Sequence, residues 1–186
     1  MPRDAFIVPL KSFAVAKERL RSAGASDVTA FAEELALGVI GGCRPREVVI
    51  VGETHDVAAF AHRHGVEFLQ SPTAGLNEAV QFAFEQLRGR YSRVVVVHGD
   101  LRSPTGLSTF EPPDGVTVVT DRHGRGTNVL AVPTSIDFRF AYGPDSAARH
   151  IGEARRLGVS STVIDNSPWG LDIDDPDDLT IDPHSI

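Results

Sequence analysis

The chain has 186 residues, 41% of them hydrophobic, and its 18 lysines and arginines stand against 25 aspartates and glutamates, for a formal net charge of −7. This length predicts one α/β domain over residues 1–186, because two ordinary domains need a longer chain. The acidic balance excludes a nucleic-acid partner, since phosphate backbones are bound by basic surfaces.

The first ten residues, MPRDAFIVPL, hold a short apolar stretch closed by Pro9. This pattern is typical of neither a signal peptide nor a transmembrane span, so we expect no membrane partner. Cys43 is the single cysteine, which rules out an intrachain disulfide and a cysteine-based metal site. We therefore expect a cytoplasmic protein.

The first part of the chain predicts strands that alternate with helices. Apolar runs predict strands over 5–8, 46–52 and 66–70. The segments between them predict helices over 12–21, 27–42 and 55–65. Glycines are expected to end the second and third of these helices, at Gly41–Gly42 and at Gly65.

A valine run marks the middle of the chain. Residues 76–90 predict a helix with one apolar face, and VVVVHGD (94–100) follows it. Four consecutive valines indicate a strand buried on both faces, as in a parallel sheet covered by helices. Ligands bind at the carboxyl ends of such strands, which makes Asp100 a candidate site residue. We expect His98 to be a hydrogen-bonded structural residue beside that site.

The last part of the chain continues the alternation. Strands are predicted over 115–121, 127–133 and 158–165, with a helix beginning near Asp145. DFRFAY (137–142) predicts an extended segment, which in a protruding hairpin could make homodimer contacts. The fold class predicted from these elements is a mostly parallel mixed sheet flanked by helices, with right-handed crossovers. We expect the tail after Leu179 to be frayed.

A second acidic cluster lies in LDIDDPDDL (171–179). In an extended chain, Asp172 and Asp174 share one face, and a hard divalent cation with oxygen ligands would relieve their repulsion. A solvated acidic turn is the alternative, and the presence of Asp100 favours the metal. Helix capping accounts for the remaining acidic residues, which are Asp175, Asp177 and Asp178.

Two further segments could bind an anion. The glycines and arginines of DRHGRGTNVL (121–130), with Thr127, suit a phosphate or carboxylate, and an ordinary turn is the alternative. In YGPDSAARH (142–150), Gly143 precedes a helix whose first turn holds Ser146. That residue could bind an anion or simply cap the helix.

The only lysines of the chain, Lys11 and Lys17, both follow the first predicted strand. Facing a carboxylate cluster, they would suit a triphosphate, whose charge must be neutralised before its phosphorus is attacked. A solvated basic helix face is the alternative.

Six segments taken in order resemble the guanylyltransferases of deazaflavin coenzyme F-420 biosynthesis, which act on 2-phospho-L-lactate or phosphoenolpyruvate. The segments are VPLKSFAVAKERL, AGLNEAV, VVVVHGDL, DRHGRGTNVL, YGPDSAARH and LDIDDPDDL. The resemblance implies a single-domain, Rossmann-like nucleotidyltransferase fold, similar to that of molybdenum-cofactor guanylyltransferase. It also implies transfer of GMP from GTP to a three-carbon phospho-acid, with release of pyrophosphate.

The resemblance further assigns roles by position. Asp100, Asp172 and Asp174 match the residues that bind Mg²⁺. Thr127, Gly143 and Ser146 match those that hold the phospho-acid. Lys11 and Lys17 match basic residues near the triphosphate, Lys11, Lys17 and Asp100 being the expected catalytic set, and Leu76 and Asn77 are placed for the nucleoside.

Phosphoenolpyruvate is the expected acceptor, with 2-phospho-L-lactate and 3-phosphoglycerate as alternatives. An acceptor phosphate is already ionised near neutral pH, so the transfer needs no general base. Two other functions stay open: a metal-dependent nucleotide-sugar glycosyltransferase, which also uses a D-x-D site, and a non-catalytic relative that binds GTP.

Overall fold

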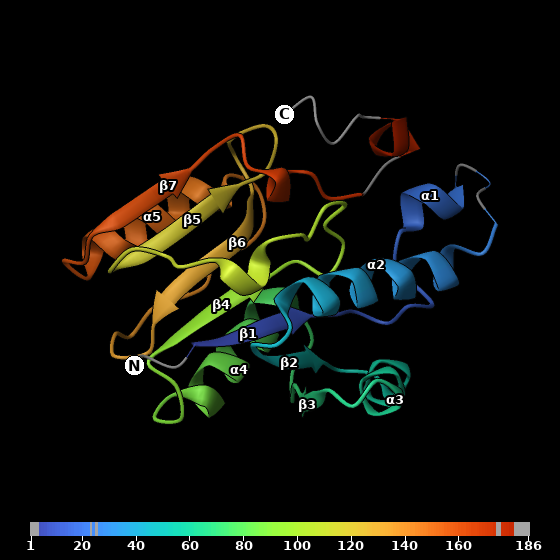
Figure 1. Cartoon of the computed structure of the whole chain (residues 1–186), viewed down its shortest axis with the longest axis horizontal. Helices are drawn as coiled ribbons and strands as arrows, with labels where there is room; N and C mark the ends of the chain where they lie inside the picture. Colours follow the sequence, from blue (N-terminus) through green and yellow to red (C-terminus); the bar gives the residue numbers. More distant parts are fainter. Residues whose placement is uncertain (1–3, 23, 25, 174–175, 181–186) are drawn as a thin grey trace.

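The computed structural model describes residues 4–22, 24, 26–173 and 176–180. A seven-stranded sheet lies at its centre, in the order β3-β2-β1-β4-β6-β5-β7 (Figure 1). All neighbouring strands are parallel except that β6 runs antiparallel to both β4 and β5. This arrangement confirms the predicted mixed, mostly parallel sheet. The strands are β1 (Asp4–Pro9), β2 (Glu47–Gly52), β3 (Glu67–Gln70), β4 (Arg93–Val97), β5 (Val116–Thr120), β6 (Thr127–Pro133) and β7 (Ser161–Ile164).

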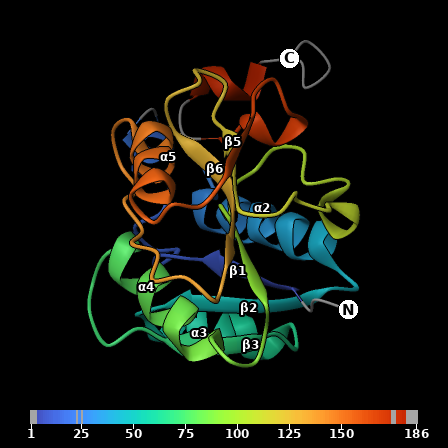
Figure 2. The same cartoon turned by 90° about the vertical axis from the view of Figure 1, so that its left-hand side faces the viewer.

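Helices cover both faces of the sheet (Figure 2). α2 and α3 pack on one face, and α4 and α5 on the other. The helices are α1 (Glu18–Ser22), α2 (Val28–Cys43), α3 (His55–Arg63), α4 (Leu76–Leu87) and α5 (Ser146–Arg156), with 3₁₀ turns η1 (Leu107–Thr109), η2 (Pro168–Gly170) and η3 (Pro176–Thr180). None of the helices in the described ranges is both long and apolar enough to cross a bilayer.

The valine run of β4 is buried on both sides, as predicted. Val94 and Val96 pack in the core beneath α4 and α5, while Val95 and Val97 pack in the core beneath α2 and α3. Neighbouring β1 divides its side chains in the same alternating way. Between their first residues, Asp4 and Arg93, and their carboxyl ends, the two central strands carry no polar side chain, so polar chemistry is confined to the strand ends.

Helix α2 does not stop at Gly41–Gly42, contrary to the sequence-based prediction. It continues to Cys43, and Arg44 then takes an extended conformation before Pro45. Gly42 has a packing role, because a Cβ at this position would lie 2.4 Å from the backbone oxygen of Pro104. At Gly41, a Cβ would meet nothing within 4 Å.

This difference gives a matched pair of variants. Gly41→Ala should stabilise the protein by about 0.5–1 kcal/mol, because alanine costs less backbone entropy within a helix. Gly42→Ala should destabilise it by about 1–3 kcal/mol, because the Pro104 backbone must move. Urea unfolding of both variants checks the prediction, and equal effects of the two substitutions would contradict it.

The segment 137–142 forms no strand and no hairpin. Its aromatic side chains, Phe138, Phe140 and Tyr142, are buried against α4 and α5, and the ring of Phe140 meets that of Phe84 edge-on at 5.4 Å. The alternating aromatic residues here belong to a connection between β6 and α5 that packs against the helices. The expected protruding hairpin for homodimer contacts is therefore wrong. Beyond Thr180, the tail expected to fray lies outside the described residues.

Candidate active site

A cavity of about 520 Å³ opens at the carboxyl ends of β1, β2 and β4. Between β1 and β4 the order of the sheet reverses direction, which is where open α/β sheets form ligand crevices. Leu10 and Lys11 follow β1, Glu53 follows β2, and His98–Asp100 follow β4 along the cavity wall. The fold thus places the tail of the valine strand where the sequence predicted chemistry.

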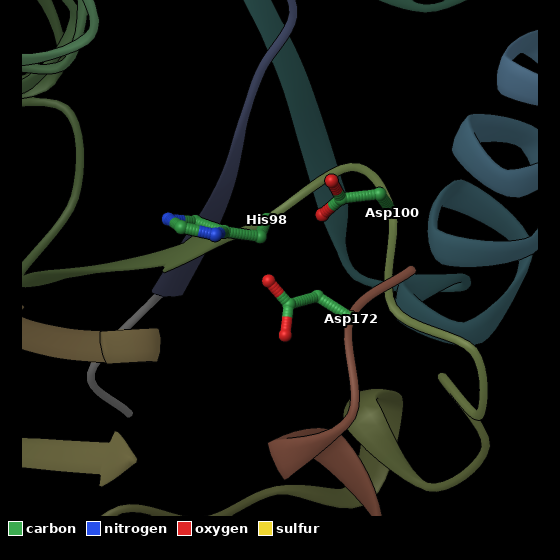
Figure 3. A group of neighbouring side chains, drawn as sticks. All are labelled: His98, Asp100 and Asp172. Atoms are coloured by element: carbon green, nitrogen blue, oxygen red, sulfur yellow. The ribbon is translucent and has the colours of Figure 1, made fainter. Parts of the chain in front are cut away.

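Two of the three predicted metal-binding aspartates come together in this cavity. Asp100 and Asp172 carry ligand atoms that lie, with one nitrogen of His98, within 4.8 Å of one another (Figure 3). The third, Asp174, lies outside the described residues. Two carboxylates and an imidazole at this spacing are a donor set that fits a divalent cation.

Backbone pairing between distant segments positions Asp172. The segment runs antiparallel to the end of β4, where Leu101 bridges to Asp172. The N–H of Arg102 donates to the carbonyl of Leu171 at 2.9 Å, and that of Ile173 donates to the carbonyl of Asp100 at 3.1 Å. Leu171 and Ile173 are buried, so Asp172 points to the opposite side, toward the cavity. The predicted extended conformation is confirmed for residues 171–173.

Lys17 forms an ion pair with Asp100. Its side chain is 6% exposed, and its backbone has a left-handed φ of 57°. The predicted helix over 12–21 is wrong in its first half, because residues 13–17 form turns and α1 begins only at Glu18. The strained turn directs the ammonium group of Lys17 to the carboxylate cluster.

Asp56, which the sequence analysis overlooked, anchors this turn. Its Oδ2 accepts hydrogen bonds from Ser12 Oγ and from the Phe13 N–H, each at 2.9 Å. Burial raises the pKa of Asp56, but hydrogen bonds from side chains and backbone outweigh it and leave the pKa below its ordinary value. The carboxylate therefore stays ionised and fixes the chain that connects β1 to Lys17. Its position on the first turn of α3 gave no sequence signal, because an acidic residue there also complements the helix dipole.

The other residues assigned to the nucleotide lie at the cavity or beside it. Lys11 is exposed and lines the cavity, as does Leu76 at the start of α4. The Asn77 amide is occupied by the protein itself: Nδ2 donates to the carbonyl of Tyr142 at 3.2 Å, and Oδ1 accepts from its N–H at 2.6 Å. Asn77 therefore joins α4 to the connection before α5.

Thr127 and Ser146, two of the residues assigned to the phospho-acid, form a buried cluster with His150. Ser146 Oγ donates to Thr127 Oγ1 at 3.2 Å, and His150 Nδ1 lies 3.1 Å from the same oxygen. The Ala141 N–H donates to His150 Nε2, which assigns the ring proton to Nδ1. Gly143, with φ of 116°, accepts from the N–H of Ser146 at 3.1 Å. The cluster does not line the cavity, and the Tyr142 ring separates it from His98.

The pKa of His150 is lowered to about 4. Burial is the main cause, and electrostatic interactions with His98 and Arg149 add to it. The imidazole is therefore neutral at physiological pH, as its two hydrogen bonds require.

The loop between β5 and β6 is closed by its own carboxylate. Asp121 Oδ1 accepts from the N–H groups of His123, at 3.0 Å, and Arg125, at 2.9 Å. These are the backbone donors that the glycine-rich sequence offered to an anion. In this structure, Asp121 takes the place of that anion.

Asp178 lies in the first turn of η3, where the sequence placed it, but it also forms a buried ion pair. Its Oδ1 lies 2.5 Å from Nη1 of Arg122. Arg102 Nη1 also donates to the carbonyl of Asp178 at 2.6 Å. The buried ion pair with Arg122 and the hydrogen bond from Arg102 connect η3 to the loops that follow β5 and β4. Asp177 is exposed at the start of η3, as capping requires, and Asp175 lies outside the described residues.

Comparison with known proteins gives one consistent result. The model of the guanylyl transferase CofC-like family matches residues 4–181. A phosphoenolpyruvate guanylyltransferase of Roseiflexus castenholzii is 32% identical over 185 residues, covering 93% of this chain and 84% of the relative. A 3-phospho-D-glycerate guanylyltransferase of Phenylobacterium zucineum is 30% identical over 152 residues, covering 77% and 69%.

Solved structures agree on the fold. A putative nucleotide-diphospho-sugar transferase from Desulfovibrio desulfuricans G20 superimposes with a TM-score of 0.68 at 13% identity, over 89% of this chain and 80% of that one. The nucleotidyltransferase type of sheet predicted from the sequence is thereby confirmed, as is the family resemblance. The chain belongs to the CofC-like guanylyl transferase family.

Proposed function

We propose that this protein transfers GMP from GTP to a three-carbon phospho-acid, with release of pyrophosphate, in coenzyme F-420 biosynthesis. The observation that carries the proposal is the convergence of Asp100, Asp172 and Lys17 at the carboxyl ends of the central strands. Two anionic reactants can be joined only where their charge is offset and their reacting atoms are aligned. We propose a cytoplasmic location for this reaction.

Asp100 and Asp172, with Asp174 as a third candidate from the sequence, would hold Mg²⁺. Bound there, the ion would neutralise charge on the phosphates and orient them for attack. The fit rests on the donor set: two carboxylates of different strand-end segments face each other at metal-ligand spacing. Asn128 Nδ2 lies 3.4 Å from Asp172 Oδ1 and also donates to the carbonyl of Trp169, which restricts how that carboxylate turns.

The two lysines have different tasks in this proposal. Lys17 lies deep in the cavity beside Asp100. It would bind the triphosphate of GTP close to the phosphorus that is attacked. Lys11 is exposed at the cavity wall and would offset the charge of the departing pyrophosphate. The apolar side chain of Leu76 would contact the nucleoside, and Asn77 would act on it indirectly by holding the Tyr142 backbone.

We propose that the acceptor phospho-acid lies beside the carboxylates and reaches the cluster of Thr127, Gly143 and Ser146 when the Tyr142 ring, which separates the cluster from the cavity, turns aside. Two donors, Ser146 Oγ and His150 Nδ1, occupy the lone pairs of Thr127 Oγ1. The hydroxyl hydrogen of Thr127 is then left to donate to an oxygen of the acceptor. Phosphoenolpyruvate is the favoured acceptor, since several relatives carry that name over nine-tenths of this chain.

The Ser146→Ala variant should raise the KM for the phospho-acid severalfold, because it removes the hydrogen bond that orients the Thr127 hydroxyl toward the acceptor, and such a bond contributes about 0.5–1.5 kcal/mol. The KM for GTP should change little. Steady-state pyrophosphate release with each substrate varied in turn measures both constants. A change confined to GTP would contradict the assignment of Ser146 to the acceptor.

The acceptor itself is identified by a parallel assay. GTP and Mg²⁺ are incubated with phosphoenolpyruvate, 2-phospho-L-lactate or 3-phosphoglycerate, and pyrophosphate is measured. The proposal expects release with one of the three and the largest kcat/KM with phosphoenolpyruvate. GTP binding without release for any acceptor would overturn it, and so would nucleoside diphosphate release from a nucleotide sugar.

A further inference from the structure

His98 ends the central strand β4 and lies beside both carboxylates of the cavity. In Figure 3, its ring nitrogen nearer the backbone, Nδ1, lies toward Asp172, and Nε2 points away from Asp100 and Asp172. The backbone of His98 is fixed, because its N–H donates to the carbonyl of Asn128 on β6 at 3.0 Å. One nitrogen of the imidazole thus faces the carboxylates, and the other nitrogen faces away from them.

Two buried polar atoms on His98 and on the neighbouring ring of Tyr142 lack partners. Among the described residues, neither His98 Nε2 nor the hydroxyl oxygen of Tyr142 makes a hydrogen bond. Tyr142 is 6% exposed, and its ring centroid lies 5.3 Å from that of His98. Leaving such atoms unsatisfied costs about 1–3 kcal/mol each, so neighbouring orphans indicate a shared role.

The two atoms are chemically complementary. The Tyr142 side chain carries a neutral hydroxyl near neutral pH, and its oxygen can accept a hydrogen bond. Histidines that bind metals usually donate their second ring N–H to such an acceptor, which fixes the tautomer and leaves the first nitrogen free to coordinate. Because the two rings are in contact, a rotation of either ring or a bridging water would join Nε2 to the hydroxyl oxygen.

We propose that His98 Nδ1 is a nitrogen ligand of the divalent cation held by Asp100 and Asp172, and that Tyr142 is its positioning residue. The proposal rests on the proposed function only in taking the two aspartates as metal ligands. It accounts for both orphan atoms with one arrangement. It also replaces the structural role that the sequence suggested for His98.

A nitrogen ligand changes which cation the site prefers. Oxygen ligands suit Mg²⁺, whereas imidazole adds affinity for transition metals in the order Mn²⁺, Fe²⁺, Co²⁺. The substrate-free protein should therefore bind Mn²⁺ more tightly than Mg²⁺, although Mg²⁺ can serve the reaction by its abundance.

The test is pulsed electron paramagnetic resonance on untagged protein loaded with Mn²⁺ alone. A ¹⁴N nucleus bound to Mn²⁺ modulates the electron spin echo, and labelling the protein with ¹⁵N-histidine should replace that ¹⁴N pattern. The modulation should vanish in His98→Ala and persist in the control His62→Gln, whose histidine is exposed on α3. Tyr142→Phe should keep the modulation but weaken Mn²⁺ binding roughly tenfold.

The wild-type measurement decides the question even if a variant folds poorly. Absence of ¹⁴N modulation in the wild-type protein, or its persistence in folded His98→Ala, would overturn the proposal. Unchanged Mn²⁺ affinity in Tyr142→Phe would remove the positioning role. Because no substrate is present, Mn²⁺ bound through His98 in a protein that releases no pyrophosphate would support this inference and contradict the proposed function.

Discussion

Replacing Asp100 with alanine should lower guanylyl transfer by roughly a thousandfold or more while the protein stays folded. The carboxylate lies at the end of the central strand, faces Asp172 and pairs with Lys17. Its removal takes away one of the proposed metal ligands and the carboxylate that pairs with Lys17. Both the alignment and the charge balance of the phosphates depend on this residue. Pyrophosphate release at saturating GTP and acceptor measures the loss.

Two further variants separate chemistry from folding. Asp100→Asn keeps the shape of the side chain and should be almost as inactive, because an amide cannot offset the charge of a cation. Asp114→Ala removes an exposed aspartate that does not line the cavity and should behave like the wild type. A folded Asp100→Ala protein that retains pyrophosphate release would refute the assignment of the carboxylate.

The stability of the protein should fall by about 3 kcal/mol as the pH is lowered from 6.5 to 4, through His150 alone. Burial lowers the pKa of this imidazole in the folded state, from its ordinary value of 6.5 to about 4. Between these two pH values, the unfolded chain binds a proton that the folded protein does not. Protonation therefore favours unfolding in this window, whereas above pH 6.5 the imidazole is neutral in both states and the effect is absent.

Urea unfolding at half-unit pH steps measures this dependence. His150→Gln should be less stable than the wild type at pH 7, because it loses hydrogen bonds, but its stability should decline less between pH 6.5 and 4. His62→Gln, at an exposed position, should keep the wild-type slope. Parallel pH profiles for the wild type and His150→Gln would show that His150 titrates normally.

The sheet could be predicted because its signals are local. Runs such as the valines of β4 can be buried only between two helical layers, and the alternation of strands with helices then sets the architecture. The prediction that a helix stops at Gly41–Gly42 was wrong, because a glycine can either end a helix or allow another segment of the chain to pack closely against it. Only the position of Pro104, far away in sequence, decides between these roles.

In the candidate site too, some residues could be predicted from local sequence and others could not. Asp100 and Asp172 could be predicted from a strand end and an alternating acidic pattern. The role of Asp56 could not, because it depends on a turn that another segment forms, and the burial of Asp178 depends on Arg122 from a different loop. Tyr142 appeared only as part of an aromatic alternation, and the lack of a partner for its hydroxyl can be seen only in three dimensions.

The backbone bridge between Leu101 and Asp172 separates the completion of the sheet from the completion of the site. All seven strands end by Ile164, so a ribosome delivers the whole sheet before it delivers the second carboxylate. During synthesis, the strands of the sheet can therefore pair before the segment that carries Asp172 joins the segment that carries Asp100. A chain that ended between Ile164 and Asp172 would contain every strand of the sheet and Asp100, but it would lack the second carboxylate of the cation cluster.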